Sequence, residues 1–244
     1  MMDGILSNEI GRLLRKGAIT GWKPLGWGSN RNFIMGIDIE NGKDPLLTIY
    51  KPQIGERALW DFPRGTLYKR EYASYLLCEA LGWDFIPPTV IREGPHGIGS
   101  LQLYIHPDPK TDYSTIMEKH IRKLQKICLF DIIANNADRK TGHYFQGVEG
   151  RVWGIDHGLT FHSSPKLRTV IWDFPDEPVP SELLEDIKNF LEGFQRAGGF
   201  AQEFEPLLAK EEIQALLERL KHILSTCRYP NPDSQGWNVP WPFY

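Results

Sequence analysis

The residues of this sequence that are best suited to chemistry lie in two short segments of its central region. The first, NNADRKTGH, carries Asp138 and Arg139, with His143 five positions after the aspartate. The second, WGIDHGLTF, delivers Asp156 at the end of an apolar run. Phosphoryl transfer requires a carboxylate beside the attacking hydroxyl and a second carboxylate that holds a divalent metal. The two segments therefore predict a phosphotransfer site, with Asp138 as the catalytic carboxylate and Asp156 as the metal ligand.

The histidine after the first aspartate bears on the choice of metal. His143 stands where protein kinases place a metal-binding Asn after the catalytic Asp. Mg²⁺ prefers oxygen ligands, whereas imidazole suits Mn²⁺, Zn²⁺ and similar metals. The sequence leaves two interpretations open. Either the site accepts Mn²⁺ as well as Mg²⁺, or His143 contacts phosphate and a second metal position is lost.

The N-terminal third supplies residues that would bind a nucleotide. The stretch LGWGSN offers Gly28 in a loop, with Ser29 and Asn30 as hydrogen-bond donors to phosphate. Lys51 ends the strand-like run LLTIYKP, where its cation can meet the α- and β-phosphates. Glu71 lies on the apolar face of the next helix, where a carboxylate needs a partner. We therefore predict an ion pair between Lys51 and Glu71 at the nucleotide phosphates.

Hydrophobic periodicity and turn residues predict the elements that position these side chains. The predicted elements are a helix over 7–17, three antiparallel strands ending at residue 51 with a hairpin turn at Asn41-Gly42, a helix over 67–81, strands over 89–92 and 100–105, a helix over 114–134, a hairpin with its turn at Glu149-Gly150, and helices over 181–196 and 210–226. Prolines at 107 and 109 break the pattern. The sequence thus predicts a small sheet-plus-helix lobe over 1–106, which binds the nucleotide, and a mainly helical lobe over 107–244, which carries the two motif segments.

Composition narrows the class of partner. The net charge of −3 gives no polycationic stretch of the kind that nucleic-acid binding needs, so no nucleic acid is expected. Cys78, Cys128 and Cys227 are odd in number and lie in apolar surroundings, which predicts buried thiols in a reducing cytoplasm. No segment resembles a signal peptide, and no apolar run approaches about 18 residues. We expect a cytoplasmic protein without an integral membrane segment. No basic amphipathic helix or cysteine-rich loop supports peripheral membrane contact.

At these residues the sequence resembles the phosphatidylinositol 3-/4-kinase superfamily of atypical kinases. The segments NADRKTGH and IDHGLTF match the two motifs of type II phosphatidylinositol 4-kinases, and IYKP is similar to their nucleotide-binding lysine strand. The chain as a whole is similar to bacterial members of the superfamily. The resemblance implies an α+β fold of the protein-kinase-like two-lobe type, with an antiparallel-sheet N-lobe that has one main helix and a mainly helical C-lobe. It also implies ATP and Mg²⁺ or Mn²⁺ as cofactors.

The resemblance also implies roles for individual residues: Asp138 is the catalytic carboxylate, Asp156 the principal metal ligand, His143 the residue at the second metal position, and Lys51 with Glu71 the pair at the phosphates. Arg139 follows the catalytic Asp as in the family, which implies that it stabilises either the loop or the transferred phosphate. His143 and His157 both replace an Asn of the family. The implied activity is an ATP-dependent phosphotransferase acting on a hydroxyl of a lipid, a protein or a small molecule.

Three alternatives stay open on the sequence. The two histidine replacements are compatible with a nucleotide-binding pseudokinase or regulatory module. A kinase-like fold can also transfer a nucleotidyl group. A zinc-dependent hydrolase would use His143, Asp156, His157 and His162 as ligands, although their spacing matches no ligand signature.

In the segment after Asp156, Lys166 and Arg168 are candidates to meet an anionic acceptor. The strand LQLYI and residues 106–108 are candidates to meet the adenine edge.

Overall fold

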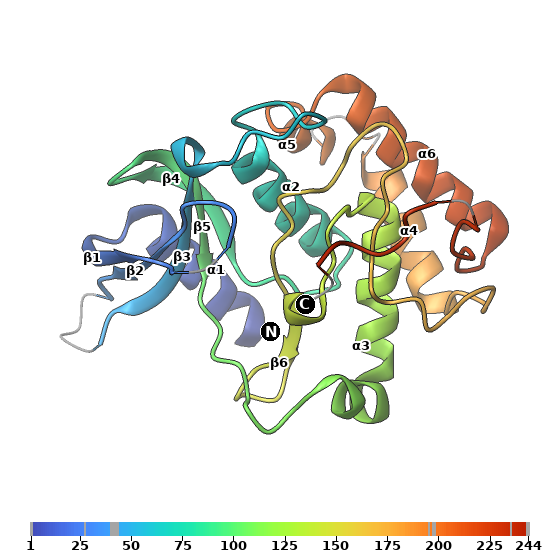
Figure 1. Cartoon of the computed structure of the whole chain (residues 1–244), viewed down its shortest axis with the longest axis horizontal. Helices are drawn as coiled ribbons and strands as arrows, with labels where there is room; N and C mark the ends of the chain where they lie inside the picture. Colours follow the sequence, from blue (N-terminus) through green and yellow to red (C-terminus); the bar gives the residue numbers. More distant parts are fainter. Residues whose placement is uncertain are drawn as a thin grey trace.

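The computed structural model of the chain describes residues 2–26, 28–39, 44–194, 196, 199–234 and 236–242. A β-sheet part and a helical part lie side by side (Figure 1). The sheet part contains α1 (Met2–Lys16), β1 (Ile19–Pro24), β2 (Phe33–Ile37), β3 (Leu46–Pro52), η1 (Gln53–Gly55), α2 (Leu67–Ala80), β4 (Thr89–Gly94) and β5 (Gly97–Leu103). The helical part contains α3 (Tyr113–Ala134), η2 (Thr141–His143), β6 (Tyr144–Gln146), β7 (Val152–Gly154), α4 (Ser181–Phe194), α5 (Ala201–Phe204) and α6 (Lys210–Thr226).

The sheet has five antiparallel strands in the order β1-β2-β3-β5-β4. Alternate residues of β3, such as Thr48 and Tyr50, are buried, and Tyr50 belongs to a small apolar core below α1 that also includes Leu14 and Leu101. Because β3 pairs with strands on both sides, the backbone of Lys51 is held firmly, opposite Ser100 of β5. The predicted turn at Asn41-Gly42 lies outside the described residues.

Helix α2 connects the sheet to the larger core of the molecule. It contacts β4 and β5, while Leu77 and Cys78 are buried in the cluster that α3, α4 and α6 share. Helix α3 begins with a capping box at Asp112 and ends at Asn135, whose φ of 53° is left-handed. The end of α3 therefore leads directly into the first predicted motif segment. Residues 53–66 form a long connection between β3 and α2.

The predicted elements are present, with shifts of a few residues at their ends. The short helix α5 was not predicted, because its four residues are too few to show a period. The prediction that all three cysteines are buried is wrong for Cys227, which is exposed. This residue ends α6 in a left-handed conformation, one turn after the buried Ile223. The division of the chain at residues 106 and 107 stays a prediction.

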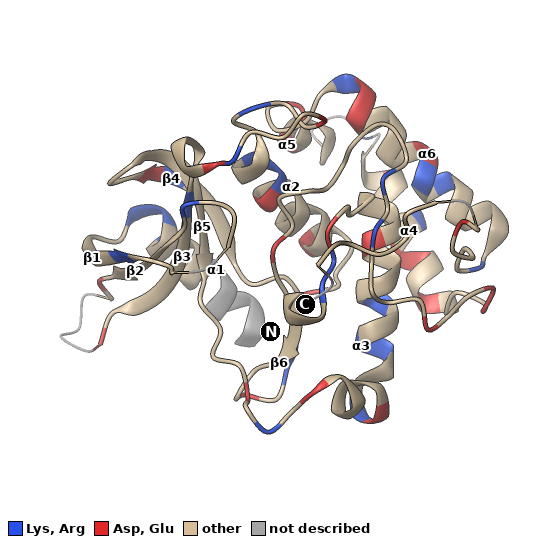
Figure 2. Cartoon of the chain, viewed as in Figure 1, with Lys and Arg blue, Asp and Glu red and all other residues tan. Residues whose placement is uncertain are grey.

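The surface carries both signs of charge. Figure 2 shows Lys and Arg interspersed with Asp and Glu over the sheet part and the helical part. Among the described residues, none of the helices combines the length and the apolar character that crossing a bilayer would require.

Candidate active site

A pocket lies where the glycine-containing loop, β3, α2 and the two motif segments meet. It is lined by Ser29, Asn30, Asn32, Lys51, Pro52, Glu56, Arg57, Leu59, Leu67, Tyr68, Glu71, Asp138, Asp156, Gly158 and Leu159. Six of the nine residues that the sequence predicted are in this set. Gly28, Arg139 and His143 are outside it. Gly28 shapes the loop instead, since its φ of +96° is a conformation that glycine adopts without strain.

Lys51 is the central cation of the pocket. Its Nζ donates to Glu71 Oε1 and, at 2.8 Å, to Asp156 Oδ1. The second oxygen of Glu71 accepts from the backbone N of His157 at 3.1 Å. Burial alone would lower the pKa of Lys51, but the carboxylates of Asp156 and Glu71 raise it above its usual value. Lys51 is therefore charged, and the predicted contact between Lys51 and Glu71 is present in the structure.

Asp156 follows β7 in a left-handed conformation with a φ of 61°, which is uncommon for a residue other than glycine. Such a conformation persists only when the surrounding structure holds it. The contact with Lys51 does so here, and the charge of Lys51 keeps the pKa of Asp156 well below its usual range. Nε2 of His143 lies 3.4 Å from Asp156 Oδ2. The carboxylate is thus ionised and has an imidazole beside it.

The donor set of Asp156 and His143 fits a metal that arrives with phosphate. The described residues contain no group of three or more His, Cys, Asp or Glu that could hold a metal by themselves. Metals that accompany nucleotides are bound through one or two protein ligands and complete their shell with phosphate oxygens and water. A carboxylate with one imidazole matches this pattern and suits Mn²⁺ as well as Mg²⁺.

His143 is neutral near pH 7. Burial lowers the pKa of His143 from 6.5 to about 4, in spite of the nearby carboxylate of Asp156. An imidazole that binds a metal must be unprotonated. Because burial already keeps the ring of His143 unprotonated, a metal would not have to displace a proton from it.

The depressed pKa of His143 predicts an effect on stability in the absence of metal. Between pH 6.5 and about 4 the unfolded chain binds a proton at this residue and the folded chain does not, so the free energy of unfolding falls as the pH is lowered through this range. His143→Asn removes the contribution. Urea unfolding of both proteins at pH about 7 and about 5 should therefore show that the free energy of unfolding falls more for the wild type than for His143→Asn as the pH is lowered. Equal losses would contradict the prediction.

Asp138 projects into the pocket from the loop after α3. Its backbone N donates to Asn136 Oδ1 at 3.0 Å, and its carboxylate lies 3.1 Å from Lys140 Nζ. Burial raises the pKa of Asp138, although Lys140 partly opposes this. A carboxylate with a raised pKa is better suited to accept a proton. Lys140 was not predicted; a cation two residues after Asp138 is the signal that would have indicated it.

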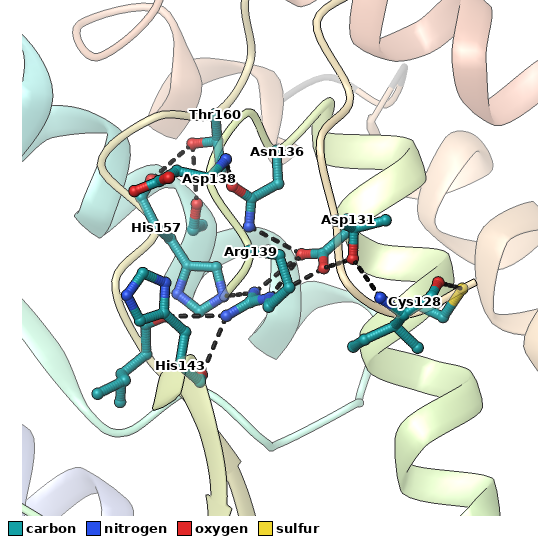
Figure 3. Close-up of polar contacts among 12 residues, drawn as sticks. Cys128, Asp131, Asn136, Asp138, Arg139, His143, His157 and Thr160 are labelled. Carbon is teal, nitrogen blue, oxygen red and sulfur yellow. Dashed lines mark hydrogen bonds and ion pairs between the residues drawn. The ribbon is translucent and has the colours of Figure 1, made fainter. Parts of the chain in front are cut away.

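Arg139 is buried, does not line the pocket and points its side chain toward Asp131 (Figure 3). Its guanidinium uses all five N–H groups: Nε and Nη2 bind the carboxylate of Asp131 at 2.9 and 2.8 Å, Nη1 donates to the carbonyls of His143 and Ile155, and Nη2 contacts His157 Nε2 at 2.7 Å. No N–H is left for a phosphate. The sequence left two roles open for Arg139. Its contacts match the stabilisation of the loop.

Asp131 was missed by the sequence analysis. Its side chain is fully buried in α3 and also accepts from Asn136 Nδ2 at 2.9 Å and from Thr169 Oγ1 at 3.3 Å. A single carboxylate in the apolar run CLFDII was the available signal, because a buried charge needs a partner. Its partner, Arg139, could not be identified from the sequence, because the two residues meet only through the chain reversal after α3.

The segment after Asp156 is hydrogen-bonded to Asn135 at the end of α3. Asn135 donates to the carbonyls of His162 and Ser164, each at 2.8 Å, and accepts from the backbone N of Lys166 at 2.8 Å. Lys166 Nζ lies 2.8 Å from Asp61 Oδ2, and both side chains are largely buried. Lys166, a candidate from the sequence to meet an anionic acceptor, is therefore paired with a carboxylate of the chain itself. Asp61, in the 53–66 connection, was not predicted as its partner.

The zinc hydrolase alternative does not fit the geometry. His157 is buried against Arg139, and Nε2 of His162 contacts the carbonyl of Asp61 at 3.0 Å. These two rings therefore do not join His143 and Asp156 around a common point, in agreement with the absence of a three-ligand group among the described residues.

The linker after β5 contacts the hairpin of β6 and β7. The carbonyl of His106 accepts from Val148 at 3.0 Å, and the backbone N of Asp108 donates to Gln146 at 2.8 Å. These two backbone groups are thus paired with the hairpin of β6 and β7. The place of the adenine edge, at LQLYI or at residues 106–108, stays a prediction.

Comparisons with known proteins show the family of the chain. The model of the family "Phosphatidylinositol 3- and 4-kinase" matches residues 92–225, more than half of the chain. Protein Rv2133c of Mycobacterium tuberculosis is 33% identical over 274 residues, which span 98% of this chain and 97% of that protein. Phosphatidylinositol 4-kinase gamma 4 of Oryza sativa subsp. japonica is 29% identical over 108 residues, which span 36% of this chain and 19% of that protein.

The fold is also found in solved structures. The crystal structure of the Golgi casein kinase superposes with a TM-score of 0.54 at 16% identity and covers 95% of this chain and 81% of that chain. The crystal structure of the same kinase with Mn/ADP bound gives the same TM-score and coverage at 14% identity. The predicted kinase-like α+β fold is confirmed. The chain belongs to the phosphatidylinositol 3- and 4-kinase family.

Proposed function

We propose that the protein is an ATP-dependent phosphotransferase that moves the γ-phosphate to a hydroxyl acceptor. One observation carries the proposal. Segments that are far apart in the sequence bring Lys51, Glu71, Asp138 and Asp156 to a single pocket. These are a phosphate-binding cation with its orienting carboxylate, a carboxylate for the acceptor and a carboxylate for the metal, which together are the parts that phosphoryl transfer uses.

The roles follow from the contacts. Lys51, oriented by Glu71, would bind the α- and β-phosphates, with Ser29 and Asn30 in the loop beside them. Asp138 would orient the acceptor hydroxyl and take its proton, while the acceptor oxygen bonds to the γ-phosphorus and the bond from that phosphorus to the bridging oxygen breaks, releasing ADP. Asp156 and His143 would hold the divalent metal, which when bound neutralises charge on the phosphates. The Mn/ADP complex of the Golgi casein kinase supports this choice of nucleotide and metal.

The place of the nucleotide base is part of the proposal. We propose that residues 1–106 and 107–244 act as two lobes and that the base lies at their junction beside the strand LQLYI. The pairing of β5 with β3 supports this position, because Lys51 lies opposite Ser100, the residue that precedes LQLYI.

Calorimetric titration with ATP and ADP, in Mg²⁺ and separately in Mn²⁺, tests the proposal. The wild type should bind both nucleotides only with metal, and Asp156→Ala should lose that metal dependence because its principal ligand is gone. We expect nucleotide binding by Asp156→Ala to weaken about tenfold or more, because at least one charge-assisted contact is lost. Asp44→Ala is the matched control, since Asp44 is an exposed carboxylate outside the pocket.

Two outcomes would count against the proposal. Absence of nucleotide binding by the folded wild type with either metal would remove its basis. Equal, metal-dependent binding by Asp156→Ala and Asp44→Ala would show that Asp156 is not the metal ligand. Thermal unfolding of each variant shows whether it is folded.

A further inference from the structure

The cations around the pocket differ in whether they have a partner. Lys51 contacts Glu71 and Asp156, and Lys140 contacts Asp138. Arg57 lines the same pocket and is exposed. Within the part of the chain that the structure describes, its guanidinium has no hydrogen bond or ion pair. Arg57 is therefore a cation that is available to a ligand.

The backbone at Arg57 is fastened to the glycine-containing loop. The N of Arg57 donates to Asn30 Oδ1 at 2.8 Å, and the N of Arg31 donates to the carbonyl of Gly55 at 2.9 Å. The two backbone segments approach so closely that a Cβ at residue 55 would lie 2.5 Å from the carbonyl oxygen of Arg31. Glycine is therefore required there, and the two loops form one unit.

The neighbouring residue fastens the same stretch to α2. Oε1 of Glu56 accepts from the backbone N of Tyr68 at 2.9 Å, in the first turn of that helix. The backbone around Arg57 is thus held from the glycine-containing loop on one side and from α2 on the other. Only the side chain of Arg57 has to be ordered when a ligand binds, which keeps the entropic cost of that contact small.

We propose that Arg57 binds the γ-phosphate of the bound nucleotide and so distinguishes a nucleoside triphosphate from a diphosphate. The inference rests on the proposed function, in which Lys51 takes the α- and β-phosphates. Arg57 lines the same pocket as Asp138, the carboxylate assigned to the acceptor, beside which the γ-phosphate would lie. A guanidinium binds phosphate oxygens with two parallel hydrogen bonds. Arg139 cannot do this, because its N–H groups are all used.

The test compares dissociation constants for a non-hydrolysable ATP analogue and for ADP, both with Mn²⁺, measured by calorimetry. Arg57→Ala should weaken binding of the analogue about tenfold or more and leave the ADP constant within about twofold, since only the γ-phosphate contact is lost. Arg57→Lys should lie between Arg57→Ala and the wild type. Arg64→Ala is the matched control, because Arg64 is exposed in the same connection but does not line this pocket. It should leave both constants unchanged.

Each other outcome overturns the inference. An unchanged ratio of the two constants in Arg57→Ala would show that Arg57 does not bind the γ-phosphate. An equal loss for both nucleotides would show that it only supports the loop. Failure of the wild type to bind either nucleotide would overturn the proposed function and this inference with it, whereas wild-type binding with an unchanged ratio in Arg57→Ala would overturn the inference alone.

Discussion

Replacement of Asp138 by Asn is expected to reduce phosphoryl transfer about 10²- to 10⁴-fold, the range for loss of a general base. The amide keeps the size of the side chain, but it cannot take the proton of the acceptor hydroxyl. Nucleotide affinity should stay within about twofold, because in the proposed site Lys51 would bind the phosphates and Asp156 the metal. The measurement is ADP formation from ATP and Mn²⁺ with three acceptor classes: phosphatidylinositol vesicles, a serine peptide and a polyol.

The controls separate catalysis from binding. Asp44→Asn makes the same chemical change at an exposed carboxylate outside the pocket and should keep full activity. A folded Asp138→Asn protein that no longer binds nucleotide would contradict the role assigned to Asp138. If the wild type binds nucleotide but transfers phosphate to none of the acceptors and to no site of its own, a regulatory module would account for the pocket better. Mass spectrometry of the incubated protein would distinguish bound phosphate from bound AMP.

Arg139→Met is expected to lower the free energy of unfolding by about 3–5 kcal/mol, because it leaves the carboxylate of Asp131 buried without its cation. Neither side chain of this pair has any solvent exposure. The double variant Asp131→Leu/Arg139→Met should recover much of the loss, since no unpaired charge is left. Urea unfolding provides the measurement. Recovery of stability would not restore transfer, because Arg139 also holds the carbonyls of His143 and Ile155 in place.

An exposed ion pair gives the comparison. Arg122 and Glu182 lie 3.9 Å apart with most of their side-chain surface in solvent. Arg122→Met should change the free energy of unfolding by less than about 1 kcal/mol. If Arg139→Met were no more destabilising than Arg122→Met, the buried cluster would not be the support of the catalytic loop that its contacts indicate.

Much of the pocket could be predicted from local sequence. Lys51 and Glu71 are recognisable because a carboxylate on the apolar face of a helix needs a cation, and a strand that ends in a lysine precedes it. Asp138 and Asp156 follow apolar segments that orient them. Strand alternation and helical periodicity predicted the sheet and the longer helices, since both patterns are repeated over several residues.

The remaining features depend on contacts between distant segments. Asp131 and Arg139 meet only because the chain reverses after α3, and no spacing rule predicts that reversal. The contact between Asp61 and Lys166 joins residues more than a hundred positions apart. Arg57 was not singled out, because an exposed arginine in a loop has no pattern; its significance comes from the pocket that it lines.

The contact between the loop that carries Asp138 and the segment after Asp156 has a consequence for the mobility of that segment. Arg139 N donates to Arg168, Val170 N donates to Arg139, and Arg168 N donates to Asn136, so the two segments run together as a short ladder above the buried Asp131. Amides in such a place exchange with solvent only when the surrounding core opens. The amides of residues 168 and 170 should therefore exchange together with those of the surrounding core. A rearrangement of these residues would break the ladder and would therefore cost folding free energy, which favours a segment that keeps its position here.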